Sequence, residues 1–190
     1  MQGAQRNSLR LLQWMMAASL APDRIRRLVL VAPVNPWSLF GKPTAEFLTK
    51  RWVAPVFLSM APLLEIIHGY LLRRLFGDAS RIRPGTLKGY SAPFAMPGAF
   101  RYGISVLNTW AQDLQRLETA LPKIAHIPTL IIWGSLDNAV DPKSAPKLSQ
   151  QFNHCQVRML EGVGHLPYEE VAEEFNRAVV DFLANCHVKP

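Results

Sequence analysis

The segment from Thr129 to Glu170 constrains the fold most, because it holds two apolar runs that each end on a small-residue turn. Thr129–Trp133 and Val157–Leu160 have the length and composition of buried strands. The region between them, residues 142–152, has the pattern of a helix. The order strand, helix, strand predicts two neighbouring parallel strands joined by a helical crossover.

One ionisable residue follows each of these two strands. Asp137 comes after a Gly-Ser turn, and His165 comes after a Gly-Val-Gly turn. In open α/β sheets, functional groups lie just beyond the carboxyl ends of parallel strands. Two such ends on neighbouring strands bring a carboxylate to a histidine, as the acid and base of a nucleophilic triad require. We therefore expect Asp137 within hydrogen-bond reach of His165.

These motifs, WGSLDNAVDP and EGVGHLPYEE, resemble the C-terminal part of the α/β-hydrolase superfamily, in which an acid and then a histidine complete a triad begun upstream. APDRIRRLVLVAP similarly resembles the segment that follows the family's nucleophile helix. The resemblance implies an α/β fold, a partial α/β-hydrolase fold whose mostly parallel sheet carries a helical cap insertion. It also implies Asp137 as the catalytic acid and His165 as the base.

Asp141 competes with Asp137 for the acid role, because it lies only four positions further on. It directly precedes Pro142, however, and an acidic residue before a proline is typical of a helix N-cap. We therefore expect Asp141 to cap the following helix and Asp137 to face the imidazole. The remaining histidines lack a comparable motif and are expected to be structural: His68, His126, His154 and His187.

The resemblance places the nucleophile at Ser8, in the sequence Arg6-Asn7-Ser8-Leu9-Arg10. Many family members carry Gly-Asn-Ser-Leu-Gly there, so the two flanking arginines replace glycines. Those glycines serve a strained strand-to-helix turn that passes close to other backbone. Two interpretations of Ser8 stay open, the nucleophile and an ordinary N-cap of a helix from Ser8 to Leu20.

The family places several strands and a loop with an oxyanion donor before its nucleophile, whereas seven residues precede Ser8 here. With Leu28–Val31, only three strands are expected. The sequence therefore predicts a truncated C-terminal portion of a hydrolase, impaired because loss of one oxyanion donor costs about 10²–10³ in turnover. It also predicts self-association through an exposed sheet edge.

The predicted domain organisation is a core of residues 1–34 and 122–190 with a cap at residues 35–121. By resemblance, the cap is a helical lid that excludes water and shapes the pocket. Its expected helices are interrupted by proline, and a last helix covers the sheet. The helical segments are expected at residues 44–76, broken at Pro55 and Pro62, at Phe100–Leu121 before Pro122, and at Tyr168–Leu183.

Composition narrows the function classes. The net charge of +7 comes from scattered basic residues without interleaved aromatic residues, which argues against nucleic-acid binding. Cys155 and Cys186 have neither metal-ligand nor redox spacing, so no metal or cofactor is implied and a cytoplasmic location is predicted. No segment has the length and hydropathy for stable membrane insertion.

Two functions are compatible with these features. The first is a serine esterase-like hydrolase with a Ser8, Asp137 and His165 triad, acting on a small hydrophobic ester or related carbonyl substrate. Carbon–carbon bond hydrolysis and acyl transfer use the same residues and stay open. The alternative is a non-catalytic interaction fragment that binds a protein partner or a membrane surface.

Overall fold

A computed structural model describes residues 14–38, 42–59 and 69–185 of the chain. Within these ranges, three strands form one sheet in the order β1 (Leu28–Val31), β2 (Thr129–Gly134), β3 (Cys155–Leu160). Both strand pairs are parallel, and Thr129 lies opposite Leu28 on one side and Cys155 on the other. The predicted parallel sheet is therefore confirmed.

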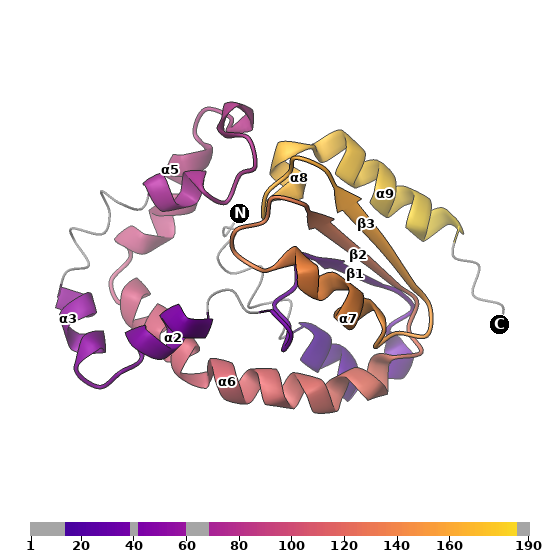
Figure 1. Ribbon diagram of the computed structural model, residues 1–190, viewed down its shortest axis with the longest axis horizontal. Coiled ribbons are helices and arrows are strands. Elements are labelled where there is room, and N and C mark those ends of the chain that lie inside the picture. Colours follow the sequence, from indigo (N-terminus) through magenta and orange to yellow (C-terminus); the bar gives the residue numbers. More distant parts are fainter. Residues whose placement is uncertain (1–13, 39–41, 60–68, 186–190) are drawn as a thin grey trace.

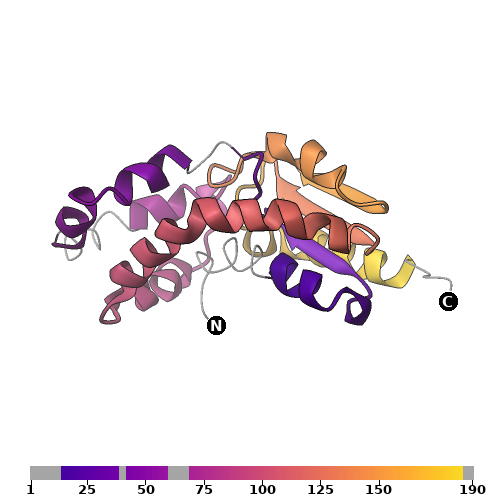
Figure 2. The same ribbon diagram turned by 90° about the horizontal axis from the view of Figure 1, so that it is seen from below.

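The central strand β2 is buried along its whole length, and alternate side chains enter two separate apolar layers. Ile131 and Trp133 pack with α7 (Ala145–Ser149) and the C-terminal half of α6 (Ala99–Ile124). Leu130 and Ile132 pack on the other face against α9 (Ala172–Asn185). Figures 1 and 2 show these helices on opposite sides of the sheet.

Strand β3 differs from the prediction, because most of its side chains are exposed rather than buried. Val157 is 41% exposed to solvent and Met159 is 39% exposed, whereas Leu160 is the one buried residue of the strand. Edge position alone does not account for this, since β1 also has a strand neighbour on one side only among the described residues and yet its side chains are buried or half-buried. Val157 and Met159 belong to neither of the two apolar layers that cover β2. An apolar run alone does not reveal how much of a strand the neighbouring helices cover.

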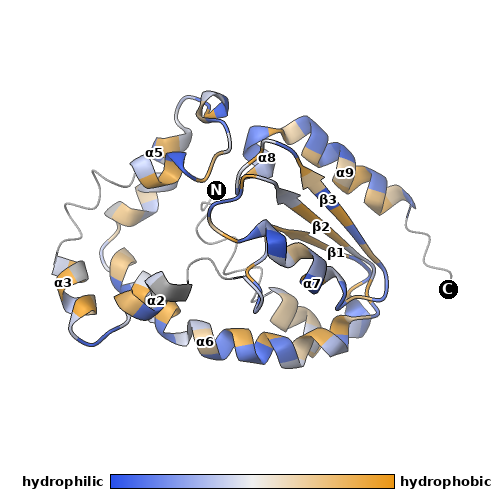
Figure 3. Cartoon of the chain, viewed as in Figure 1, coloured by the Kyte–Doolittle hydropathy of each residue, from blue (hydrophilic) through white to orange (hydrophobic). Residues whose placement is uncertain are grey.

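The other helices precede β2 or follow β3 in the chain. Figures 1 and 2 show α2, α3 and α5 on one side of the molecule, with the long α6 spanning from them to the sheet. Hydrophobic and hydrophilic residues alternate along these helices (Figure 3). No helix in the described ranges is long and apolar enough to cross a membrane. Their bounds are α2 (Lys42–Leu48), α3 (Val53–Ser59), α5 (Thr86–Ser91) and α8 (Pro167–Glu170). Residues 14–20 and 69–73 are also helical. The 3₁₀ turns cover Pro22–Arg24, Ala79–Arg81, Ala92–Ala95 and Pro142–Ser144.

Two prolines do not end helices where the sequence predicts. Pro55 lies in the first turn of α3, where a missing backbone N–H leaves no hydrogen bond unmade. Pro122 lies inside α6, which runs on to Ile124 because its last turn is anchored by the buried Leu121 and Ile124. Pro62 lies outside the described residues.

The predicted last helix is instead two helices. Val171, at φ −135° and ψ 54°, separates α8 from α9. The break lets α8 stay beside the segment that carries His165, while α9 turns to cover the sheet (Figure 1). The division into core and cap at residues 35–121 stays a prediction.

The exposed apolar side chains of β3 predict self-association of the purified chain. We expect sedimentation velocity to show reversible association between about 1 and 100 μM, since exposed apolar surface and unpaired strand edges promote association at micromolar to millimolar concentrations. Val157→Lys should weaken the association, because it places a charge on the exposed apolar face. The control Gln156→Lys adds the same charge on the opposite face and should have less effect. A monomer at every concentration would contradict the prediction.

Candidate active site

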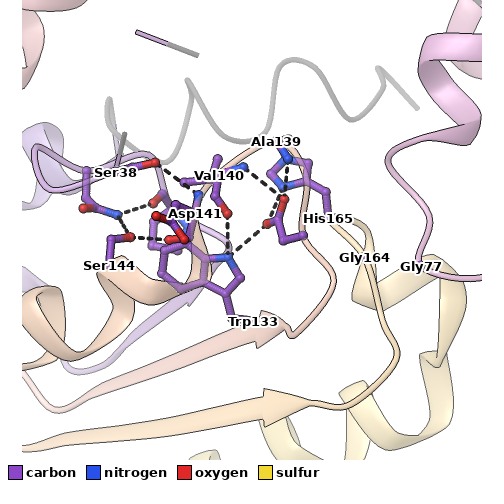
Figure 4. A network of polar contacts seen from close by, with 12 residues as sticks. Ser38, Gly77, Trp133, Ala139, Val140, Asp141, Ser144, Gly164 and His165 are labelled. Carbon is purple, nitrogen blue, oxygen red and sulfur yellow. Dashed lines mark hydrogen bonds and ion pairs between the residues drawn. The ribbon is translucent and has the colours of Figure 1, made fainter. Parts of the chain in front are cut away.

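The acid and the histidine predicted from the sequence lie together at the carboxyl edge of the sheet. Asp137 follows β2, His165 follows β3, and the distance from Asp137 Oδ2 to His165 Nδ1 is 2.8 Å. Both residues are buried, with 3% and 6% of their surface exposed. The expected proximity is confirmed (Figure 4).

The carboxylate of Asp137 is held by donors on both oxygens. Oδ1 accepts the backbone N–H groups of Ala139 at 2.7 Å and Val140 at 3.0 Å. Oδ2 accepts the indole N–H of Trp133 at 3.0 Å. Since these three neighbours can only donate, the carboxylate acts as an acceptor and His165 Nδ1 carries the hydrogen between them. In the neutral imidazole with its hydrogen on Nδ1, Nε2 has the lone pair that a general base requires.

Trp133 is a site residue that the sequence pattern predicts only as the end of a strand. Its side chain is fully buried, and its Nε1–H lies between Asp137 Oδ2 and the carbonyl oxygen of Val140, 3.2 Å away. The indole therefore fixes both the acid and the loop that follows it. A tryptophan four residues before a candidate acid, at the end of a buried strand, is the signal that was missed.

The two loops approach so closely that a side chain cannot fit between them. A Cβ atom on Gly134 would lie 2.2 Å from the carbonyl oxygens of both Val163 and Gly164. The loops are also joined by hydrogen bonds, from Leu136 N–H to Val163 O at 2.9 Å and from Gly162 N–H to Ser135 Oγ at 3.0 Å. The Gly-Ser and Gly-Val-Gly turns thus position the acid and the histidine.

Asp141 has the capping role predicted for it. It is the N-cap of the 3₁₀ turn that begins at Pro142, and its Oδ1 accepts the N–H of Lys143 at 3.0 Å. Its own backbone N–H donates to Ser38 Oγ at 3.1 Å, which ties the acid loop to the loop after β1. Figure 4 shows this network beside the Asp137 contacts.

The structure does not place the predicted nucleophile, since Ser8 lies outside the described residues, as do His68, His187 and Cys186. His126 and His154 are exposed and lie before β2 and β3, at the opposite edge of the sheet from His165. In the described part of the chain, no three His, Cys, Asp or Glu side chains gather as a metal site would require.

A cavity of about 300 Å³ lies among the loop after β1, α2 and α6. Its wall combines apolar side chains of α6 with two glutamates. It reaches Ser38, the residue that accepts the N–H of Asp141. Its lining includes Ser38, Glu46, Leu107, Trp110, Leu114 and Glu118.

Comparison with known proteins agrees with this geometry. Residues 12–172 match the family model described as the alpha/beta hydrolase fold. The chain is 29% identical over 171 residues to a 2-hydroxymuconate semialdehyde hydrolase of Pseudomonas sp., covering 86% of this chain and 55% of that protein. It is 38% identical over 61 residues to the monoacylglycerol lipase ABHD6 of Homo sapiens, covering 32% of this chain and 18% of that one. The chain thus spans about half or less of these relatives' length.

Solved structures show the same fold at low identity. The 2-hydroxy-6-oxo-6-phenylhexa-2,4-dienoate hydrolase of Rhodococcus sp. superposes with a TM-score of 0.73 at 15% identity, covering 94% of this chain and 62% of that one. A serine hydrolase of Cycloclasticus zankles superposes with a TM-score of 0.70 at 17% identity, covering 96% and 64%. Both likenesses concern the fold alone.

The contacts of Trp133 predict that Trp133→Phe loosens the acid. The variant removes one of the two donors to Asp137 Oδ2 and the indole donor to the Val140 carbonyl, which should lower the free energy of unfolding by about 1–3 kcal/mol in urea titrations. The His165 Nδ1 proton resonance should also shift or broaden. The control Trp52→Phe changes a tryptophan that is 67% exposed, and should cost less than about 0.5 kcal/mol. Equal losses in both variants would contradict the prediction.

Burial raises the pKa of the Cys155 thiol to about 11, which predicts a slow thiol at neutral pH. A raised pKa lowers the thiolate fraction, so labelling by a disulfide reagent in a Cys186→Ser background should be slow at pH 7.5 and accelerate as the pH approaches 11. The same chain unfolded in guanidinium is the control and should react as a free cysteine. Equal rates in the folded and unfolded states would refute the prediction.

Proposed function

Since this chain belongs to the alpha/beta hydrolase fold family, we propose that its site serves the hydrolysis of a hydrophobic ester or a related carbonyl substrate. The observation that carries the proposal is the buried 2.8 Å contact between Asp137 Oδ2 and His165 Nδ1. It lies where two parallel strands end, which is where open α/β sheets present functional groups.

In the proposed reaction, His165 Nε2 takes the proton of a nucleophile that attacks the substrate carbonyl. Asp137 keeps the ring oriented and stabilises the imidazolium that forms. We assign the nucleophile to Ser8 on its sequence motif. The imidazolium then gives this proton to the leaving alcohol as the ester bond breaks, which leaves an acyl-enzyme and a neutral imidazole. A water molecule activated by the same Nε2 then releases the acid and restores Ser8.

Two observations support a hydrophobic substrate. The cavity beside Ser38 has Leu107, Trp110 and Leu114 in its wall, and apolar walls are typical of sites for such ligands. One curated relative is a monoacylglycerol lipase. In this proposal residues 35–121 form the cap over the substrate, and residues 1–34 and 122–190 form the core.

A non-catalytic interaction role is the second candidate. The observation in its favour is the half-exposed apolar pair of β3, Val157 and Met159, since an exposed strand edge is a surface that another chain can pair with. Dependence of hydrolysis on His165 separates the two candidates.

The proposed function predicts slow hydrolysis of p-nitrophenyl esters that depends on the acid, the base and Ser8. His165→Ala, Asp137→Asn and Ser8→Ala should each lower the rate of the purified chain by about 10²-fold or more, since each removes a member of one proton-transfer unit. The rate of the unsubstituted chain should be low, because Arg6 and Arg10 stand where the family carries glycines.

His126→Ala is the matched control for this assay, since it removes an exposed imidazole at the opposite edge of the sheet. It should hydrolyse the ester at the unsubstituted rate. A rate that is the same with and without His165 would reject the proposed base and leave the interaction role as the better account.

A further inference from the structure

A second buried carboxylate, unused in the reaction proposed above, lies against the loop that carries His165. Glu170 ends α8, and its side chain has no exposed surface. Oε1 accepts the backbone N–H of Gly164 at 2.6 Å, and both oxygens lie 3.0 Å from the N–H of Gly77. Oε2 also accepts the N–H of Asp78 at 3.2 Å. One carboxylate thus accepts hydrogen bonds from three backbone amides.

These amides come from two segments that are far apart in the sequence. Gly164 directly precedes His165, whereas Gly77 is 93 residues before Glu170 and follows the helical residues 69–73. The segments also bond directly, since the His165 N–H donates to Leu75 O at 2.7 Å. Figure 4 shows Gly77 beside Gly164. The carboxylate therefore closes a contact between the histidine loop and residues 75–78.

The contact has no room for side chains. A Cβ atom on Gly164 would lie 2.3 Å from Leu75 O, and one on Gly77 would lie 2.6 Å from Gly162 O. Arg81 adds a cation to the same contact, with Nη1 3.7 Å from Glu170 Oε2 and 3.3 Å from Gly162 O. Backbone packed this closely is held in place by its hydrogen bonds, and Glu170 accepts three of them.

We infer that Glu170 is a positioning residue for His165, which fixes the backbone of the histidine loop against residues 75–78. Through it, the location of the helical segments before residue 75 is coupled to the orientation of the imidazole. The inference rests on the proposed function for the role of His165 as base. Its catalytic consequence follows from geometry, because a displacement of about 1 Å in a reacting group costs on the order of 10²-fold in rate.

Glu170→Gln tests the inference with little change in size. Its amide group presents a donor to backbone N–H groups, so it satisfies fewer of them than the carboxylate does. Glu170→Asp is the second variant, which keeps the charge and withdraws it by one methylene group. The control is Glu169→Gln, on the same helix, whose carboxylate accepts from the Tyr90 hydroxyl at 2.9 Å and touches none of the three amides.

We expect hydrogen exchange at the Gly77 and Gly164 amides to accelerate at least about 10-fold in both Glu170 variants. The His165 Nδ1 proton resonance should shift or broaden. In ester hydrolysis kcat should fall by about 10- to 100-fold with KM little changed, because the base moves while the substrate site stays. Glu169→Gln should leave all three readouts unchanged.

Unchanged amide exchange and an unchanged imidazole resonance in both variants would overturn the inference. A lower melting temperature with the resonance preserved, or failure of both variants to fold, would overturn it too, since Glu170 would then act only on stability. Exchange and resonance need no substrate. If both respond as expected while hydrolysis is independent of His165, the proposed function fails and the positioning of the imidazole stands.

Discussion

The site depends on a contact of three backbone segments that meet without side chains between them at the carboxyl edge of the sheet. Cβ atoms on Gly77 and Gly134 would lie within 2.6 Å and 2.2 Å of carbonyl oxygens of the histidine loop, residues 162–164. Such distances exclude every residue except glycine unless the backbone shifts. The amides and carbonyls that are buried there must bond to one another or to a buried acceptor. The positions of the acid and the histidine follow from that requirement.

Two buried carboxylates serve as those acceptors, and they act over different ranges of sequence. Asp137 accepts two amides of its own loop and an indole N–H from the strand before it, so it shapes a local turn around the imidazole. Glu170 accepts amides from segments 6 and 93 residues away. A buried carboxylate without donors would be strongly disfavoured. Each carboxylate is therefore stable in its buried place only in the fold that supplies its hydrogen-bond donors. The geometry of the site thus depends on the fold, and the fold in turn depends on these hydrogen bonds.

This difference in range explains what the sequence could predict. The Asp137–His165 contact was predictable, because each residue follows an apolar run and a small-residue turn, and parallel strands bring such ends together. The exposure of β3 was not predictable, because how far the helices cover each face of a strand is a property of the whole fold. The continuation of α6 through Pro122 was missed because core packing outweighs a local helix breaker. Glu170 gave no local signal, since most of its partners lie far along the chain.

The fixed sides of His165 also restrict how any nucleophile can approach. The Nδ1 side of the ring faces Asp137, and the backbone N–H is bonded to Leu75 O. The residue is 6% exposed, so the open part of the imidazole is small. A nucleophile that transfers a proton to the ring must reach Nε2, whichever residue supplies it. The acid and the base are therefore assembled by contacts within residues 75–170, and this part of the chain sets the position to which a nucleophile has to be delivered.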